Sequence, residues 1–349
     1  MPARSRRLTL GDAEIETPLM VPSISSKAIG PIELGQQNYG TQMVPASLLH
    51  SETFIPGIDE CVLISAYDIN FGYIKDADTL KTGFARSLYA TPKVLFIDSG
   101  WYEKSVGPAS GPWYYDVGDA QPFEEVDYMA VIDSLDPDIR AVVVAWDYDG
   151  SYRDQVDAAQ RFFATRERFT SEILLKPERG RRFHSINELS VATAERLQAF
   201  AVVGVTEKDL GDTILKRLTT LAGLRRRLDE ANVSQPIHVF GGMDPLITPL
   251  YFNAGAEIFD GLSWLRYAFR DGMCVHRDAA ALLNRQYEKR LPVAIAQIQI
   301  ANLDALTELS RELKVFFHNN SDWTKLRNGE LFQHAAEAME SAIEGKHGR

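Results

Sequence analysis

The chain has 349 residues, of which 45% are hydrophobic and 24% are charged, and its formal net charge is −11. This is ordinary globular composition with enough chain for a large core, and no segment approaches the ~18 apolar residues of a membrane helix. The N-terminus lacks the apolar segment of a secretion signal, and the distant Cys61 and Cys274 do not suggest a disulfide framework. We therefore expect a soluble, cytoplasmic protein without membrane contact, in which any nucleic-acid contact uses a local basic patch.

The first elements predicted along the chain are strands. Residues 8–18, "LTLGDAEIETP", alternate like a small β-hairpin that could plug one end of a barrel. Eight short apolar runs follow, separated by polar or Gly/Pro-rich loops and helical patterns. Continuous apolar runs without alternation are typical of parallel strands that are buried on both faces. The runs are residues 19–25, 62–67, 93–99, 141–147, 172–176, 200–205, 237–242 and 257–261.

Two of the helical patterns between these runs are well marked. Residues 185–200 open with Ser185 and Glu188, which have the spacing of a capping box. Residues 207–231 form a long amphipathic pattern, in which we expect the arginines at 225–227 to be solvated.

Strands that alternate with helices predict an α/β fold, a (β/α)8 TIM barrel. We expect the barrel to span residues 1–290 and the helical pattern of residues 291–349 to form a C-terminal extension packed on it. A doubly wound sheet is the alternative, although no Gly-rich fingerprint follows the first strand. Residues 100–122 form the longest irregular stretch, and a loop this long is usually functional or mobile.

Three of the apolar runs end in an acid: Asp98 in "LFIDSG", Asp147 in "VVAWDYDG" and Asp260 in "IFDG". In a barrel the carboxyl ends of the strands meet at one rim, where the chemistry takes place. Carboxylates that converge in one pocket suit nucleophilic or acid–base work at a glycosidic carbon. Each acid could instead cap the next turn or helix. That alternative is weaker for all three together, because Gly, an aromatic residue or a further acid follows them.

Seven stretches carry a further pattern, among them "FIDSGWYE" and the stretch that ends in "EIFDG". In the same order along the chain they resemble segments of the tRNA-guanine transglycosylase superfamily. Its members are (β/α)8-barrel enzymes that exchange guanine in nucleic acid for a 7-deazaguanine. In character the chain is closest to the branch that modifies DNA. The stretches are residues 14–22, 96–103, 143–150, 200–210, 237–261, 265–272 and 295–313.

The resemblance implies a role for each matching residue at the rim. Asp260 matches the nucleophile that attacks the sugar C1′ and forms a covalent glycosyl-enzyme, and Asp98 matches the general acid/base that protonates the leaving base. Asp147 matches the carboxylate that reads the N1–H and N2-amino edge of the purine, which presents two donors. The remaining matches are Tyr102 and Phe240, which would sandwich the base, and Gly204 and Val205, whose backbone would contact it.

Basic residues near the acids are the candidates for nucleic-acid binding. The resemblance implies that Arg266 and Arg270 hold backbone phosphates, although a solvated surface or salt bridges are the alternative for each. For Trp264 and Tyr267 the alternative to base contact is packing under the loop. The best local basic patch at the predicted rim lies in "KPERGRRFH", where Lys176 could donate to the purine O6. It consists of Lys176, Arg179, Arg181 and Arg182.

The chain departs from the family at the zinc site. The family holds zinc with "CxCxxC" and a histidine, whereas the matching interval here has only Cys274 and His276, and a closed zinc site needs four ligands. We expect no metal, no zinc subdomain and no organic cofactor. The missing insert and the altered "LSWLR" loop (262–266) favour DNA over tRNA as the substrate.

The expected function is exchange of guanine in DNA for a free 7-deazaguanine base such as preQ0, by a homodimer or with accessory proteins. Three alternatives stay open. The first is the same exchange on tRNA, of the queuosine or archaeosine type. The second is a non-catalytic family member that binds nucleic acid. The third is a retaining glycoside hydrolase with Asp98 and Asp260 as its carboxyl pair.

Overall fold

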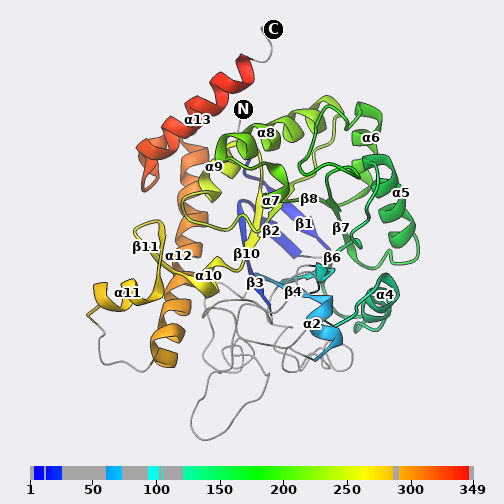
Figure 1. Cartoon of the computed structure of the whole chain (residues 1–349), viewed down its shortest axis with the longest axis horizontal. Coiled ribbons are helices and arrows are strands. Elements are labelled where there is room, and N and C mark those ends of the chain that lie inside the picture. Colours follow the sequence, from blue (N-terminus) through cyan, green and yellow to red (C-terminus); the bar gives the residue numbers. More distant parts are fainter. Residues whose placement is uncertain are drawn as a thin grey trace, which may run out of the picture.

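Eight parallel strands close into a barrel in the computed structural model (Figure 1), which describes residues 4–11, 13–25, 60–72, 93–101, 104, 121–285 and 291–345. Each predicted apolar run contributes one strand, and β10 pairs with β3 to close the ring. The (β/α)8 fold is confirmed, and the doubly wound alternative is wrong. The barrel strands are β3 (Leu19–Ile24), β4 (Cys61–Ser65), β5 (Val94–Asp98), β6 (Ala141–Val144), β7 (Thr170–Leu175), β8 (Val202–Thr206), β9 (Ile237–Phe240) and β10 (Ile258–Gly261).

Helices surround the barrel, and two short antiparallel pairs of strands lie outside it. None of the helices in the described ranges is long and apolar enough to span a membrane. The strand pairs are β1 (Arg7–Leu10) with β2 (Ala13–Glu16), and β11 (Ala268–Arg270) with β12 (Met273–Val275). The helices are α2 (Ala66–Asn70), α4 (Glu125–Asp133), α5 (Tyr152–Phe163), α6 (Val191–Glu195), α7 (Glu207–Leu210), α8 (Ile214–Glu230), α9 (Thr248–Asn253), α10 (Ser263–Arg266), α11 (Arg277–Leu283), α12 (Leu291–His318) and α13 (Gly329–Glu344).

Two predicted helices are shorter than expected. The capping box of Ser185 and Glu188 is wrong, because the helix begins only after Ser190, whose side chain accepts a backbone N–H at 3.1 Å. Glu188 instead forms an ion pair with Arg181. The segment before Ser190 is therefore a loop. The long pattern of residues 207–231 is divided into α7 and α8.

The N-terminal hairpin closes one end of the barrel. Its apolar residues Leu10, Ala13 and Ile15 are at most 7% exposed and belong to the cluster that fills the barrel interior. The same cluster contains Leu19 and Val94, which are the first residues of their strands. The hairpin therefore covers the N-terminal ends of the strands and leaves the C-terminal ends accessible, where the predicted acids lie.

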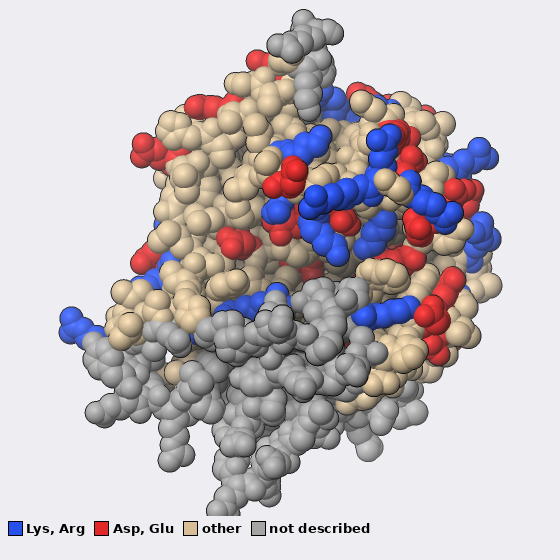
Figure 2. Space-filling model, in the orientation of Figure 1, with Lys and Arg blue, Asp and Glu red and all other residues tan. Residues whose placement is uncertain are grey.

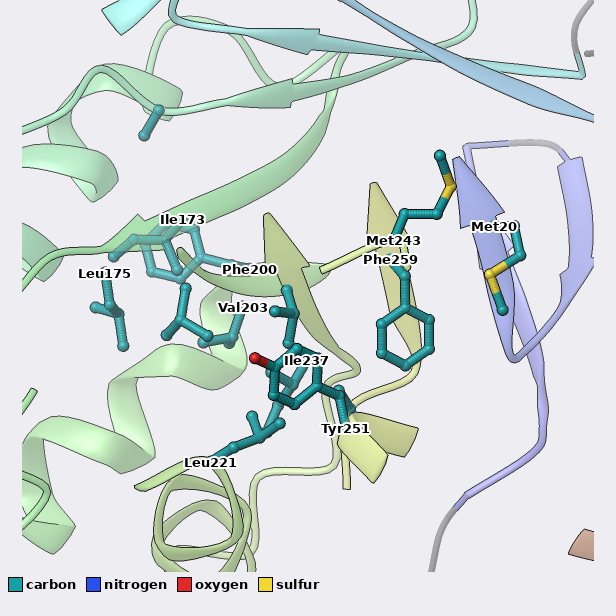
Figure 3. Close-up of a cluster of buried hydrophobic side chains, with 14 of the residues drawn as sticks. Met20, Ile173, Leu175, Phe200, Val203, Leu221, Ile237, Met243, Tyr251 and Phe259 are labelled. Atoms are coloured by element: carbon teal, nitrogen blue, oxygen red, sulfur yellow. The ribbon is translucent and has the colours of Figure 1, made fainter. Parts of the chain in front are cut away.

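A second apolar layer lies between the barrel and the helices. Figure 3 shows Val203 of β8 and Ile237 of β9 near Leu221 of α8 and Tyr251 of α9. All four side chains are at most 1% exposed. Burial of each aliphatic side chain of this kind stabilises the fold by roughly 1.5–3 kcal/mol. This layer therefore fixes the strands whose ends carry the candidate site.

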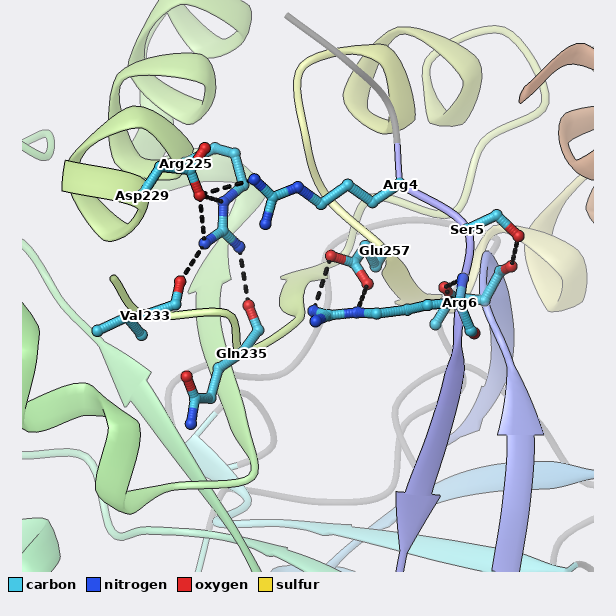
Figure 4. A network of polar contacts seen from close by, with 9 residues as sticks. Arg4, Ser5, Arg6, Arg225, Asp229, Val233, Gln235 and Glu257 are labelled. Carbon is cyan, nitrogen blue, oxygen red and sulfur yellow. Dashed lines mark hydrogen bonds and ion pairs between the residues drawn. The ribbon is translucent and has the colours of Figure 1, made fainter. Parts of the chain in front are cut away.

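Polar side chains tie α8 and the N-terminal segment to the strands (Figure 4). Arg225 is 1% exposed, and its guanidinium donates to the carbonyl of Gln235 at 2.8 Å and to that of Val233 at 2.5 Å. Arg6 donates to both carboxylate oxygens of the buried Glu257, at 2.7 and 2.9 Å. The expectation of a solvated side chain is wrong for Arg225, because the segment that follows α8 needs donors for its carbonyls.

Arg225→Ala is expected to lower the free energy of unfolding by about 3 kcal/mol, because two backbone carbonyls lose their donor and Asp229 keeps only Arg4. Urea denaturation measures the change. Arg226→Ala, at the half-buried neighbouring position, is the control and should change stability by less than about 1 kcal/mol. Equal losses in the two variants would contradict this structural role.

The C-terminal helices pack on the barrel. Ser310 Oγ of α12 donates to the carbonyl of Pro18 at 2.8 Å, and Lys314 Nζ lies 3.2 Å from a carboxylate oxygen of Glu16. Helix α13 contacts α8 and α9. The predicted boundary at residue 290 lies outside the described residues, so the division into a barrel and an extension remains a prediction.

Basic side chains are not spread evenly over the surface. The chain is acidic overall. Even so, Figure 2 shows Lys and Arg gathered near the centre of one face, over the region where Figure 1 places α7 and α8. Asp and Glu lie between them.

Candidate active site

A cavity of about 400 Å³, here called the rim cavity, lies at the C-terminal ends of the barrel strands. Its wall contains the three predicted acids: Asp98 ends β5, Asp147 follows β6, and Asp260 lies near the end of β10. They meet because parallel strands in a closed barrel end at one rim. Other predicted residues in this wall are Lys176, Phe240 and Arg266.

The carboxylate of Asp260 is held by two donors. Ser23 Oγ, on the neighbouring strand β3, donates to Oδ2 at 2.7 Å, and the backbone N–H of Gly241 donates to Oδ1 at 2.8 Å. Gly241 has a φ of 79°, which favours glycine at this turn. Asp260 is only 6% exposed. A carboxylate held in one orientation at a cavity wall is suited to attack an electrophilic carbon.

A histidine and a glutamate that sequence analysis missed lie next to Asp260 inside the barrel. His238 Nδ1 is 2.8 Å from Glu172 Oε1, and His238 Nε2 is 3.5 Å from Asp260 Oδ1. Both side chains are fully buried. The sequence feature that could have identified them is a titratable residue inside an apolar strand, because such a residue needs a polar partner when it is buried.

The two carboxylates favour the protonated form of His238. Burial alone would lower the pKa of His238, but Glu172 and Asp260 outweigh burial and raise that pKa to about 9. Burial raises the pKa of Glu172, and the charge of His238 opposes this rise. We take the two as an ion pair near neutral pH, because a second carboxylate faces the other ring nitrogen. His238 therefore places a positive charge beside Asp260.

Asp147 presents an unsatisfied carboxylate oxygen. Its Oδ2 lies 3.4 Å from Lys176 Nζ and 3.4 Å from Ser99 Oγ, whereas its buried Oδ1 has no hydrogen-bond partner in the described part of the chain. Asp98 Oδ1 accepts the backbone N–H of Ser99 at 2.7 Å. An unsatisfied buried acceptor is costly. An N–H donor that reached Oδ1 would satisfy this oxygen.

Two aromatic side chains of the rim cavity can stack on a flat ligand. The Phe240 ring lies on His238, with 4.0 Å between ring centroids and 28° between the planes. Trp101, which sequence analysis did not single out, lines the cavity and is 42% exposed. The sequence feature that could have identified Trp101 is its position two residues after Ser99 in "FIDSGWYE". Tyr102, the predicted partner of Phe240, lies outside the described residues.

Gly204 makes room for Phe240. A Cβ at this position would lie 2.7 Å from Phe240 Cε2 and 3.0 Å from Glu172 Oε1. Val205 is 1% exposed and belongs to the apolar layer outside the barrel, so only its backbone could meet a ligand. Backbone contact between this pair and a base stays a prediction.

Gly204→Ala is expected to displace the Phe240 ring or the Glu172 carboxylate, since a contact of 2.7 Å requires a neighbour to move. We expect the free energy of unfolding to fall by roughly 1–3 kcal/mol, which urea denaturation measures. Gly223→Ala in α8 is the matched control, because a Cβ there meets nothing closer than 3.6 Å. A Gly204→Ala protein as stable as the parent would contradict this packing.

Helix α12 holds the loop that follows β10. Asn302 Nδ2 donates to the carbonyls of Trp264 and Tyr267, at 2.7 and 2.8 Å. Trp264 is 1% exposed, and its Nε1 donates to the carbonyl of Ser23 at 2.9 Å. Trp264 therefore packs under the loop, whereas Tyr267 is 44% exposed and lines the rim cavity.

The two arginines predicted after the nucleophile lie apart. Arg266 lines the rim cavity. Arg270 donates to Asn284 Oδ1 at 2.5 Å and lines a different cavity, beside α12. Only Arg266 is therefore placed to meet a strand whose nucleotide enters the rim cavity.

The predicted basic patch is also divided. Lys176 reaches the rim cavity, whereas the side chain of Arg179 is 74% exposed and forms an ion pair with Asp149. Arg181 and Arg182 line a third cavity that shares no lining residue with the rim cavity. The loop between β7 and α6 thus sends its basic side chains to different places.

In the parts of the chain that the structure describes, no group of three or more His, Cys, Asp or Glu side chains could hold a metal ion. Cys61 is buried, Cys274 is half-buried, and neither forms a disulfide. His276, the other remaining residue of the family's zinc interval, is exposed.

Comparison with known proteins gives one informative relative. No family model matches the chain. A tRNA-guanine(15) transglycosylase of Picrophilus torridus is 24% identical over 302 residues, which are 83% of this chain and 42% of that protein. The chain therefore spans about two fifths of the length of this curated relative. The similarity supports the resemblance to the tRNA-guanine transglycosylase superfamily that the ordered motifs indicate.

Proposed function

We propose that the chain is a base-exchanging glycosyltransferase that replaces guanine in nucleic acid with a 7-deazaguanine through a covalent intermediate on Asp260. One observation carries this most directly. Two carboxylates of different character share the rim cavity: Asp260 is held by Ser23 and Gly241, while Asp147 has an unsatisfied oxygen. The first suits a nucleophile and the second suits a reader of N–H donors. The ordered motifs and the Picrophilus torridus relative support the same function.

The proposed reaction has two halves that use the same carboxylates. In the first, Asp260 attacks C1′ of an extruded nucleotide, the C1′–N9 bond breaks, and Asp98 gives a proton to the departing guanine. In the second, the incoming base gives its N9 proton to Asp98 and attacks C1′, which releases Asp260. No proton or electron is gained or lost over the cycle. Both residues line the rim cavity, as this sequence of steps requires.

Recognition of the base follows from Asp147 and Lys176. Guanine and 7-deazaguanines present N1–H and N2–H donors beside the O6 acceptor on the Watson–Crick edge. Asp147 Oδ1 can accept from the donors, and Lys176 Nζ, 3.4 Å from Oδ2, can donate to O6. Stacking on Phe240 and on Trp101 or Tyr102 would add roughly 1–3 kcal/mol per ring. Adenine, with its donor and acceptor exchanged, should be rejected.

We favour DNA as the polymer, because the zinc insert of the tRNA enzymes is missing from the sequence and the loop after Asp260 is altered. The second candidate is exchange in tRNA, and the name of the Picrophilus torridus relative favours it. Radiolabelled guanine offered with duplex DNA and with bulk tRNA separates the two, with Asp260→Ala as the control. Label in DNA alone supports the DNA proposal. Label in tRNA alone overturns the polymer and keeps the chemistry, and label in neither contradicts the exchange activity itself.

A further inference from the structure

The cavity that Arg181 and Arg182 line has a volume of about 600 Å³, lies on the outer wall of the barrel and is here called the outer cavity. It is bounded by the loop before α6, by α8 and by Ile343 of α13, and none of its lining residues belongs to the rim cavity. Its charged lining residues are five cations and one carboxylate: Arg181, Arg182, Lys216, Arg226, Arg227 and Glu230.

Some of the cations in the outer cavity have a carboxylate partner among the described residues, and others do not. Arg181 pairs with Glu188, and Arg227 Nε lies 3.2 Å from Glu230 Oε2. Neither Arg182 nor Lys216 forms an ion pair within the described residues. Like charges that converge in one cavity repel each other, and folding alone does not require the arrangement. An anionic ligand would compensate it.

The wall of the outer cavity also contains a buried donor. His184 is 5% exposed, and its Nδ1 lies 3.0 Å from the hydroxyl of Tyr152. We assign the Tyr152 hydroxyl as the donor in this contact and Nδ1 as the acceptor. Nε2 then carries the ring proton, and this buried atom has no hydrogen-bond partner among the described residues. Burial lowers the pKa of His184 to about 4, so the ring is a neutral donor near pH 7.

The floor of the outer cavity is kept open by a glycine. Gly223 lies in the middle of α8, where glycine is less favourable than alanine. A Cβ there would meet only Ile186, at 3.6 Å or more, so packing does not require glycine. Lys216, Gly223 and Arg227 lie on one face of α8 and span about 16 Å. The open floor and the cations thus form one elongated basic surface.

We propose that the outer cavity binds phosphodiester groups of the nucleic acid whose extruded nucleotide enters the rim cavity. The identity of this ligand rests on the proposed function, and the anionic chemistry rests on the cavity itself. The two cavities are linked through the loop after β7 and through α8. The loop that carries Arg181 begins directly after Lys176, and Arg217 of α8 is paired with Glu207 of the rim-cavity wall. A strand could therefore pass from one to the other along this loop and α8.

The test measures nucleic-acid binding by fluorescence anisotropy at several salt concentrations, in an Asp260→Asn background that removes turnover. Arg182→Ala combined with Lys216→Ala should weaken binding of duplex DNA by about tenfold and reduce the slope of log K against log [salt] by about 1.8, which is 0.9 for each lost phosphate contact. Labelled tRNA is titrated in parallel. The matched control is Arg311→Ala combined with Lys325→Ala, which removes the same charge from exposed positions outside the cavity.

The Gly223→Gln variant tests whether nucleic-acid binding can be weakened without a loss of stability. It fills the floor of the outer cavity without changing charge, and a good helix former at this position should leave the melting temperature unchanged or higher. We expect it to weaken binding severalfold all the same. The proposal would be overturned if all variants bound both polymers with the same affinities and the same salt dependence as the control pair.

Two further outcomes distinguish this proposal from the proposed function. If the parent protein exchanges guanine but the outer-cavity variants bind like the control pair, the exchange function stands and the phosphate site is lost. If no polymer is exchanged but the slope falls as expected, the phosphate site stands and the exchange function is lost. If a mononucleotide binds the parent and competes fully with nucleic acid in the outer cavity, the polymer assignment is overturned.

Discussion

Asp260→Asn is expected to abolish both base exchange and the covalent protein–nucleic acid complex. An amide keeps the size of the carboxylate and can still accept the N–H of Gly241, but it cannot form a glycosyl ester. Because the nucleophile is lost, exchange should fall by about 10⁴-fold or more. Incorporation of labelled guanine measures the rate, and a denaturing gel detects the covalent complex.

Asp98→Asn is the matched comparison, because it removes a proton donor from the same cavity and leaves the nucleophile in place. Exchange should fall by roughly 10²–10⁴-fold, with little change in the affinity for nucleic acid. A leaving base that needs no proton should restore the covalent complex to Asp98→Asn but not to Asp260→Asn. Exchange by Asp260→Asn at the parent rate would show that another group is the nucleophile.

The parts of the site that could be predicted are those that the strand pattern alone determines. Continuous apolar runs predict buried parallel strands, and an acid that ends such a run is expected at the common rim. Asp98, Asp147 and Asp260 are therefore expected at one rim, where all three line the rim cavity. Their roles follow from the family resemblance and not from this geometry.

The rest depends on contacts across the barrel or along loops, which local pattern does not specify. Glu172 and His238 meet because β7 and β9 both flank β8, with Gly204 paired to His238 and giving no side chain between them. The basic run after Lys176 looked like one patch, but a loop without regular structure sends its side chains to different cavities. The sequence predicts a solvated Arg225, whereas its guanidinium donates to two carbonyls of the segment after α8.

The rate of exchange is expected to decline as the pH rises through about 9, because His238 loses its proton there. With Glu172 and Asp260 as anions and His238 as a cation, the three groups carry one net negative charge. When Asp260 becomes a glycosyl ester, the remaining pair is neutral. When the ester breaks in the second half of the reaction, the carboxylate returns beside the imidazolium, which stabilises it.

Two variants test this electrostatic role. His238→Asn removes the cation and should slow exchange by about 10²-fold, and its rate should no longer decline near pH 9. Glu172→Gln removes the charge that does most to raise the pKa of His238, so the decline should move to lower pH. Titration of ¹⁵N-labelled histidine by NMR reports the protonation of His238 without any need for turnover.

The same proton should appear in the stability of the fold. The pKa of His238 is raised from 6.5 to about 9 on folding, so its contribution is fully present below pH 6.5 and is lost as the pH rises through about 9. The free energy of unfolding of the parent should fall across this window by up to about 3 kcal/mol, and His238→Asn should lack that part of the fall. If stability and exchange depended on pH identically in the parent and in His238→Asn, the ring would have to be neutral in the folded protein. Asp260 would then rely on Ser23 and Gly241 alone.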